Sequence, residues 1–301
     1  MNGEWLSRLC ENSRFPASLR DTVTETVAEI EASPALRALY ETVEDKTFGK
    51  VNTYPEILSF AASRGMDGER LALAFCAMMT RRAWETVYVP LGASEKIFYD
   101  SMRDIVIWAE TFRRARGRWG MPKQFWWVAG LLRAEVIRLG RLEFEQISHY
   151  PFDEPYDRAG VHLEKNTIVH HIHIPEDGPL RTADRLDSYR QAVDFLHIDT
   201  PAVFVCHSWL LYPPLIGLLP ESSNTASFYR EFDIVETECC ENHGDLWRVF
   251  GKRDSYDPAT LPRETAMQRA LADYLARGGM MGSGFGVMIF DGEKVISPGK
   301  K

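Results

Sequence analysis

Three histidines stand close together in the segment IVHHIHIPEDGPL, residues 168–180. The segment has the composition of a β-strand followed by a turn. Successive side chains of a strand point to opposite faces, so His171 and His173 share one face and His170 lies on the other. An imidazole can act as a base near neutral pH or bind a metal ion. This strand is therefore the first place to look for chemistry.

A metal site is one interpretation of these histidines. His171, His173 and Glu176 form an H-x-H-x-x-E pattern that resembles the first motif of cupin metal sites. A metal needs three or four convergent ligands. The histidines further along the chain fall in a predicted helix end, a buried strand and a loop: His197, His207 and His243. A cupin-like metal-dependent enzyme using His171 and His173 stays an alternative, and we expect no metal.

The residues after the strand predict a turn and then a helix. A strand, a Gly/Pro turn and a helix N-terminus together present main-chain N–H groups and a positive dipole end to phosphates. Arg181 and Arg185 would add charge-assisted contacts, and Asp184 is a candidate helix cap. Cys206 and His207 are neighbours in a predicted strand and point to opposite faces, which argues against a Cys–His nucleophile.

Two halves of the chain differ in the period of their apolar residues. Residues 1–138 show helical spacing, with Ser33 and Ser94 as candidate N-caps and Gly117 as a helix stop. From residue 139 the spacing alternates as in strands. We predict an α+β protein, with an all-helical domain over residues 1–120 and a mixed β-sheet flanked by helices over 121–301. Particular segments are predicted as a helix (125–140), a strand (245–251), a linker or bend (278–286) and a hairpin (286–296).

Composition narrows the classes of function. The chain has 301 residues, a net charge of −8 and five scattered cysteines. We expect reduced thiols and a cytoplasmic protein, because neither a signal peptide nor an apolar run long enough for a membrane is apparent. The basic cluster at residues 111–120 follows a helical pattern and is not the basic stripe that nucleic acid requires. We therefore expect no nucleic-acid or membrane partner.

The order of elements in the second half resembles the GNAT acyltransferase superfamily. HIHIPEDGPLRTADR takes the place of the fourth strand and phosphate loop, and SNTASFYREFDIVET echoes a later helix and strand through Asn224, Tyr229 and Phe232. The usual glycine-rich loop is reduced to Gly178, and the spacings around Tyr229 are each two residues shorter than in the family. The whole chain resembles a bacterial branch in which a helical N-terminal domain precedes a GNAT-like domain.

The resemblance implies an acyl-CoA co-substrate, acetyl-CoA or a longer acyl-CoA, held where the fourth and fifth strands splay apart. It implies direct attack by an amine of a small molecule or peptide. Tyr229 matches the general acid, and His171 or Glu143 is the candidate base, with Glu145 a rival. The implied coenzyme contacts are His173, Ile174, Gly178, Leu180, Arg181, Arg185 and Asn224. A GNAT-shaped binding protein without catalysis is the main alternative, and the oligomeric state is not predicted.

Overall fold

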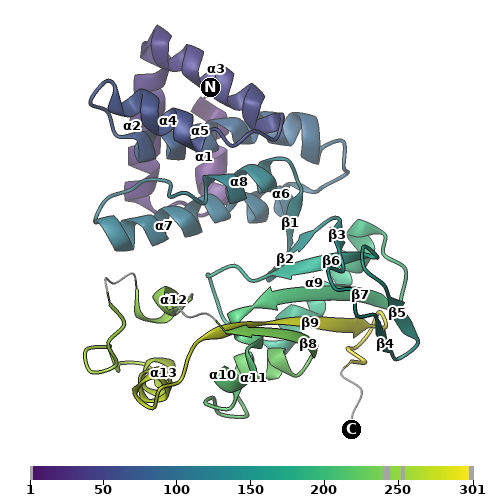
Figure 1. The fold of residues 1–301 in the computed structure, drawn as a ribbon. Coiled ribbons are helices and arrows are strands. Elements are labelled where there is room, and N and C mark those ends of the chain that lie inside the picture. Colours follow the sequence, from purple (N-terminus) through teal and green to yellow (C-terminus); the bar gives the residue numbers. More distant parts are fainter. Residues whose placement is uncertain (1–2, 240–244, 252–254, 298–301) are drawn as a thin grey trace. The chain divides into compact units, whose positions relative to one another are not determined.

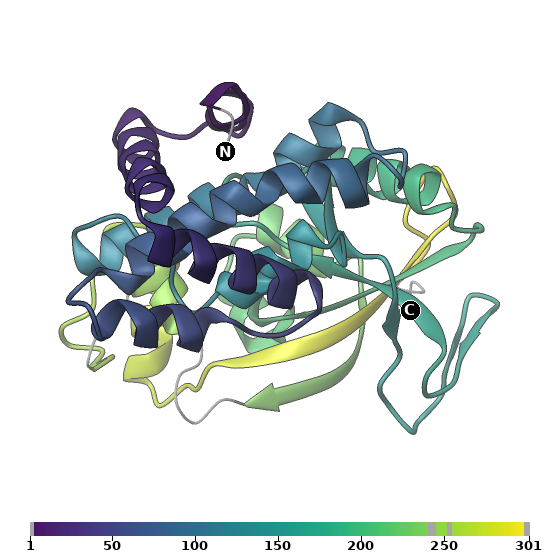
Figure 2. The ribbon, with the colours of Figure 1, turned by 90° about the horizontal axis from the view of Figure 1, so that it is seen from above.

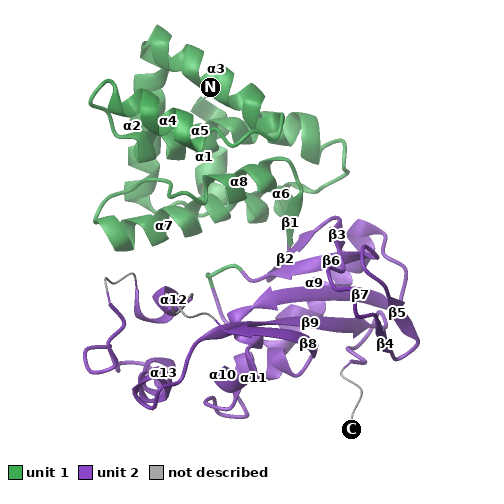
Figure 3. Ribbon diagram, in the orientation of Figure 1, with its two compact units in different colours: residues 1–138, 175–177 green, residues 139–174, 178–301 purple. Residues whose placement is uncertain are grey.

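The computed structural model describes residues 3–239, 245–251 and 255–297. The chain forms two compact units (Figure 3): unit 1 is residues 1–138 with 175–177, and unit 2 is residues 139–174 with 178–301. The predicted domain boundary at residue 120 falls in the loop after α7. The mixed α+β fold with a helical first half and a sheet flanked by helices is confirmed.

Unit 1 is helical up to β1 (Figure 1). Its helix α5 is buried along most of its length, as its apolar composition predicts, and the other helices pack around it. The helices are α1 (Gly3–Asn12), α2 (Ala17–Ala32), α3 (Pro34–Phe48), α4 (Tyr54–Ala62), α5 (Gly68–Ala83), the π-helix η1 (Trp84–Tyr88), α6 (Glu95–Met102), α7 (Asp104–Arg116) and α8 (Phe125–Leu132).

The predicted helix ends of unit 1 are largely confirmed. Ser33 and Ser94 each accept a hydrogen bond from a main-chain N–H of the first turn, and Gly117 ends α7 at φ 73°. The prediction of one helix over 125–140 is wrong. Ala134 has φ 51°, which an α-helix cannot contain, and the β-branched residues that follow form strand β1 (Val136–Leu139).

Unit 2 is built on an open mixed sheet with the order β1-β2-β6-β7-β9-β8. Among the strand pairs whose register is described, only β6 and β7 run parallel. Figure 2 shows yellow β9 running alongside light green β8, its antiparallel neighbour. An open sheet is not the closed barrel of a cupin, so that fold is excluded. The strands are β2 (Leu142–Glu145), β3 (Ser148–His149), β4 (Tyr156–Arg158), β5 (Val161–Leu163), β6 (Ile168–His173), β7 (Ala202–Ser208), β8 (Asp233–Cys239) and β9 (Gly282–Phe290).

Different groups cover the two faces of this sheet. Helix α9 (Thr182–Leu196) packs on one face, where the ring of Tyr189 stacks on Phe204 with 5.8 Å between centroids. On the other face, Tyr150 and Tyr156 join Val205 in a separate apolar cluster. The short helices of this unit are η2 (Trp209–Leu211), α10 (Pro213–Ile216), α11 (Asn224–Tyr229), α12 (Leu246–Phe250) and α13 (Ala266–Ala276).

The C-terminal third departs most from the sequence prediction. Residues 245–251, predicted as a strand, contain helix α12, and the predicted linker at 278–286 contains the first half of β9. The glycines of β9 permit close packing: a Cβ on Gly284 would lie 2.2 Å from the carbonyl oxygen of Leu211. They are therefore needed where η2 crosses the strand. The second arm of the predicted hairpin is reduced to a single bridge between Phe290 and Val295.

Candidate functional site

Strands β6 and β7 pair over only part of their length. The parallel register consists of His170 with Phe204 and His171 with Val205. Beyond these pairs β6 continues against β2 as far as His173, and β7 continues against β9 as far as Ser208. Residues 172–174 and 206–208, all described, do not pair with each other. The predicted divergence of these two strands is thus confirmed.

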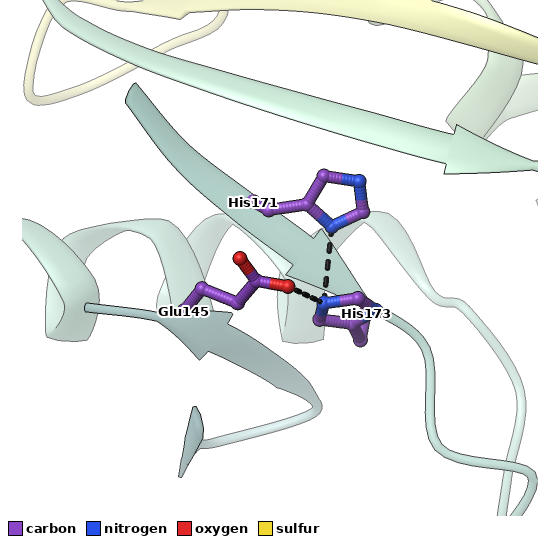
Figure 4. Close-up of side chains that lie close together, drawn as sticks. All are labelled: Glu145, His171 and His173. Atoms are coloured by element: carbon purple, nitrogen blue, oxygen red, sulfur yellow. Dashed lines mark hydrogen bonds and ion pairs between the residues drawn. The ribbon is translucent and has the colours of Figure 1, made fainter. Parts of the chain in front are cut away.

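Polar side chains collect on one face of the sheet at this opening. Strand alternation and register place His171, His173 and Glu145 on the same face, opposite to Phe144 and Phe204. Figure 4 shows the three polar side chains converging, with His173 Nε2 2.8 Å from Glu145 Oε1 and 3.0 Å from His171 Nδ1. One ring nitrogen cannot donate to Glu145 and accept from His171 together, so His173 Nε2 serves one of them at a time.

The protonation of His171 follows from its contacts. Burial, and then the neighbouring His173, lower the pKa of His171 to about 3, so its ring is neutral near pH 7. Its Nε2 accepts a hydrogen bond from the main-chain N–H of His207, 3.1 Å away. A neutral imidazole has one N–H, so the proton lies on Nδ1 and points toward His173. In this tautomer His173 Nε2 accepts from His171 and does not donate to Glu145.

The carboxylate and the two imidazoles are also of the types that bind metal ions. One ligand atom from each of Glu145, His171 and His173 lies within 4.8 Å of the others. A metal on Nδ1 of His171 would, however, move that proton to Nε2, where it would face the N–H of His207. Metal binding therefore excludes the observed contact between His171 and His207. Glu176, the ligand expected from the sequence, forms an ion pair with Arg114 at 3.1 Å.

A second polar group lies across the opening on β7, β8 and β9. His207 Nε2 is 2.8 Å from Ser283 Oγ, and that hydroxyl donates to Glu238 Oε1 at 2.9 Å. Because the only hydroxyl proton of Ser283 goes to Glu238, His207 must donate from Nε2, and in a neutral ring the lone pair is then on Nδ1. The His207 side chain is 47% exposed and the Glu238 side chain 61% exposed.

Sequence reasoning did not link these residues. The sequence places Ser283 in a predicted linker and Glu238 in a strand without a role, and it offers His207 only as a possible metal ligand and as the neighbour of Cys206. The strand register brings them together, since Glu238 stands opposite Ser283 and Ser208 opposite Gly284. Alternation along β7 could have placed His207 on the face of His171. The partners on β8 and β9 required knowledge of which strands are neighbours.

The other predicted site residues lie in α9, α11 and the preceding loop. Tyr229 ends α11, where burial raises the pKa of its hydroxyl, and Asn224 begins that helix. Arg185 is fully buried and donates to Glu231 and to the carbonyl of Leu180. A phosphate contact by Arg185 would require breaking this ion pair. Arg181 is the exposed residue immediately before α9.

The loop after β6 turns its carbonyl groups toward an arginine. Arg141 donates from Nη2 to the carbonyl of Gly178, at 2.5 Å, and from Nε to that of Pro179, at 3.1 Å. Glu143 is 1% exposed and stands opposite His173 in the sheet. Ile174 follows the last residue of β6. The roles of Gly178, Glu143 and Ile174 stay predictions.

Family models match nearly the whole chain. A GNAT-like C-terminal domain matches residues 136–288, and an N-acyltransferase N-terminal domain matches residues 4–134. The chain belongs to the GNAT-like N-acyltransferase family. A search of curated proteins finds no match to this member of the family. No helix among its described residues is long and apolar enough to cross a membrane.

Solved structures share the fold of this family member. An acyltransferase in complex with decanoyl-CoA and teicoplanin superimposes with a TM-score of 0.72 at 19% identity, covering 96% of this chain and 89% of the other. An acyltransferase with CoA and 10C-teicoplanin gives 0.70 at 18%, covering 95% and 87%. A mutant acyltransferase with octanoyl-CoA gives 0.72 at 19%, covering 95% and 88%. At these identities the likeness establishes the fold.

Proposed function

We propose that the protein transfers an acyl group from an acyl-CoA to an amine. The observation that carries the proposal is the divergence of β6 and β7 in a chain of this family. Main-chain groups at a strand edge can hydrogen-bond an extended ligand as an added strand would, and pantetheine is such a ligand. Structures of similar fold hold octanoyl-CoA and decanoyl-CoA, which makes longer acyl-CoAs suitable donors to test alongside acetyl-CoA.

The coenzyme would lie along β6 and the start of α9. We assign the pantetheine arm to main-chain groups of His173 and Ile174, and the pyrophosphate to the loop from Gly178 through Leu180 to Arg181. Helix α9 has 15 residues, and the side chain of its N-cap residue, Arg181, forms no hydrogen bond with the N–H groups of the first turn. Asn224 would contact the coenzyme from α11.

We propose that Arg185 stabilises this loop. It donates to the Leu180 carbonyl and, at 3.1 Å, to Ser227 Oγ in α11. It therefore links the start of α9 to the helix that carries Tyr229. We assign it the positioning of these two elements rather than a direct phosphate contact.

The chemical step needs a base and an acid. Among the described residues of the site, His207 combines an exposed ring with an Nδ1 atom that has no hydrogen-bond partner, whereas Glu143 is buried and both ring nitrogens of His171 have partners. We propose that His207 takes the proton from the attacking amine. The new bond joins the amine nitrogen to the acyl carbon as the carbon–sulfur bond breaks.

Tyr229 would protonate the departing thiolate. No described residue forms a hydrogen bond with its hydroxyl, and the raised pKa keeps the hydroxyl protonated at neutral pH. A protonated, unengaged hydroxyl is what a general acid requires. Its reprotonation would use solvent after coenzyme release.

The acceptor would be an amine of a small molecule or peptide. Exposed carboxylates of β8, Glu236 and Glu238, lie on the site side of the sheet edge and would attract a protonated amine. One structure of similar fold holds teicoplanin beside decanoyl-CoA. Amines on peptides and on glycosylated peptides are therefore a reasonable first panel.

Binding and turnover together test the proposal. Calorimetry should show binding of acetyl-, octanoyl- or decanoyl-CoA, and a thiol-detecting assay should show CoA release that depends on an amine. Tyr229→Phe should keep coenzyme affinity and lose about 10²–10⁴-fold in turnover. Coenzyme binding without turnover for any amine would favour the binding-protein alternative. Absence of coenzyme binding would refute the proposed function.

A further inference from the structure

The separation of β6 and β7 begins at one hydrogen bond. If the parallel ladder continued beyond His171 and Val205, the N–H of His207 would bond a main-chain carbonyl of β6. That N–H instead donates to the side chain of His171, at 3.1 Å. A side chain thus occupies the position where the next main-chain bond of the ladder would form.

We infer that His171 is a positioning residue that holds the two strands apart at the start of the coenzyme slot. Its ring accepts a hydrogen bond from the His207 N–H, so opening the ladder leaves this main-chain donor paired. The contact also occupies the His207 N–H. A thioester carbonyl in the opening would therefore accept a hydrogen bond from a main-chain N–H of β6. The role requires an acceptor at the Nε2 position and no transfer of a proton.

The neighbouring residues fix the orientation of the His171 ring. His173 Nε2 lies 3.0 Å from Nδ1, and the Phe285 ring lies 6.3 Å from the His171 ring. The two imidazoles are 4.4 Å apart between centroids. The Nε2 atom is thereby directed across the gap toward β7 rather than along β6. His170, on the opposite face of the same strand, packs its ring against Phe204 of β7, forms no hydrogen bond with the described residues of β7, and approaches the Glu145 carbonyl instead.

Substitution by glutamine separates this role from that of a base. The amide oxygen of glutamine reaches about as far as Nε2 and accepts a hydrogen bond, but it cannot take up a proton at neutral pH. The inference rests on the proposed function. His171→Gln should therefore bind acyl-CoA within about threefold of the wild type and keep its turnover at saturation. His171→Ala should weaken acyl-CoA binding by about tenfold, which corresponds to about 1.4 kcal/mol.

The opposite pattern would overturn the inference. If His171 were the base, both variants would bind acyl-CoA normally and both would lose turnover by about 10²–10⁴-fold. His170→Gln and His170→Ala are matched controls on the other face, and both should leave acyl-CoA affinity unchanged. Equal acyl-CoA affinity of His171→Ala and the wild type would also refute the role.

A measurement on the protein without coenzyme separates this inference from the proposed function. In 15N-histidine spectra His171 should carry its proton on Nδ1, and the His207 amide should exchange slowly with deuterium. His171→Ala should speed that exchange, whereas His171→Gln should not. A proton on Nε2 of His171 would contradict the inference. If these spectra agree but wild-type protein binds no acyl-CoA, the proposed function fails while the strand-opening role stands.

Discussion

The two faces of the central sheet carry different kinds of side chains, although the same strands supply both. On the face that α9 covers, Phe144 and Phe204 are fully buried. On the other face stand Glu145, which follows Phe144 in β2, and the histidines His171 and His173 of β6. Because strand side chains alternate, each strand supplies the fold with one set of residues and the site with the other. Stability and chemistry can therefore be changed separately here.

The site face is itself divided along the strands. Where β6 and β7 are paired, Val169 and Val205 lie in an apolar cluster with Tyr150. Where the ladder stops, imidazoles and carboxylates replace the apolar residues. Unpaired main-chain groups need polar surroundings or a ligand, so the polar end of the face coincides with the end of the ladder. Substitutions on the two faces should therefore differ in their effects on stability and on activity.

Phe204→Ala should have the largest effect on the free energy of unfolding. The Phe204 ring lies between the rings of Phe144 and Tyr189, at centroid distances of 5.4 Å and 5.8 Å. Removing a buried phenyl group costs about 3–5 kcal/mol through lost burial and the cavity left behind. Denaturant titration measures this loss. The control is Glu238→Ala on the exposed side, which should change the free energy of unfolding by less than about 0.5 kcal/mol. Similar costs for both variants would contradict the division between the faces.

Arg185→Met should destabilise the α9 side by roughly 3 kcal/mol, because it leaves the Glu231 carboxylate buried without its ion-pair partner. The figure is at the low end for a broken buried pair since Tyr189 still donates to Glu231, at 2.7 Å. Denaturant titration of the double variant Arg185→Met, Glu231→Met should recover most of the loss. A double variant as unstable as the single one would show that the charge is not the cause.

Gly284→Ala should cost about 1–3 kcal/mol, the usual price of forcing extra atoms into a packed region. The added Cβ would stand 2.2 Å from the Leu211 carbonyl oxygen, and backbone cannot move aside as a side chain can. Gly217→Ala is the control, because its Cβ would meet only the Pro214 oxygen at 3.7 Å. Thermal melting should give a lower melting temperature for Gly284→Ala than for Gly217→Ala. Equal melting temperatures would mean that η2 does not pack tightly on β9.

Much of the fold follows from local sequence patterns. The helices of unit 1 follow from apolar spacing and from caps such as Ser33 and Ser94. These signals act within one turn of chain, so the sequence contains them in full. The sequence predicts a strand where helix α12 lies, because five residues hold too little of either period to decide between the two. The glycines of β9 were misread because their reason lies in a distant segment, η2.

The candidate site was predictable only where it lies on one strand. His171 and His173 could be placed on a common face from alternation alone. Their partner is Glu145 rather than Glu176, because β2 lies beside β6 in the sheet while Glu176 pairs with Arg114. Such partners depend on strand order and register, which local patterns do not contain. The opening of β6 and β7 was predicted through the family resemblance and not from the residues.

His207→Gln should have the smallest effect on stability and a large one on activity. The side chain is half-exposed and packs on the site face, so the free energy of unfolding should change by less than about 0.5 kcal/mol. Glutamine can still hydrogen-bond Ser283 but cannot accept the proton of an amine. Turnover should therefore fall by about 10²–10⁴-fold with acyl-CoA affinity unchanged, measured by CoA release and calorimetry.

His162→Gln, an exposed histidine of β5, is the matched control and should change neither quantity. Full turnover in His207→Gln would assign the proton to another group, with the buried Glu143 next in line. A stability loss near that of Phe204→Ala would be more serious, because it would mean that the site face also holds the fold together. The variant therefore tests the base and the separation of the two faces in one protein, and the two readouts fail independently.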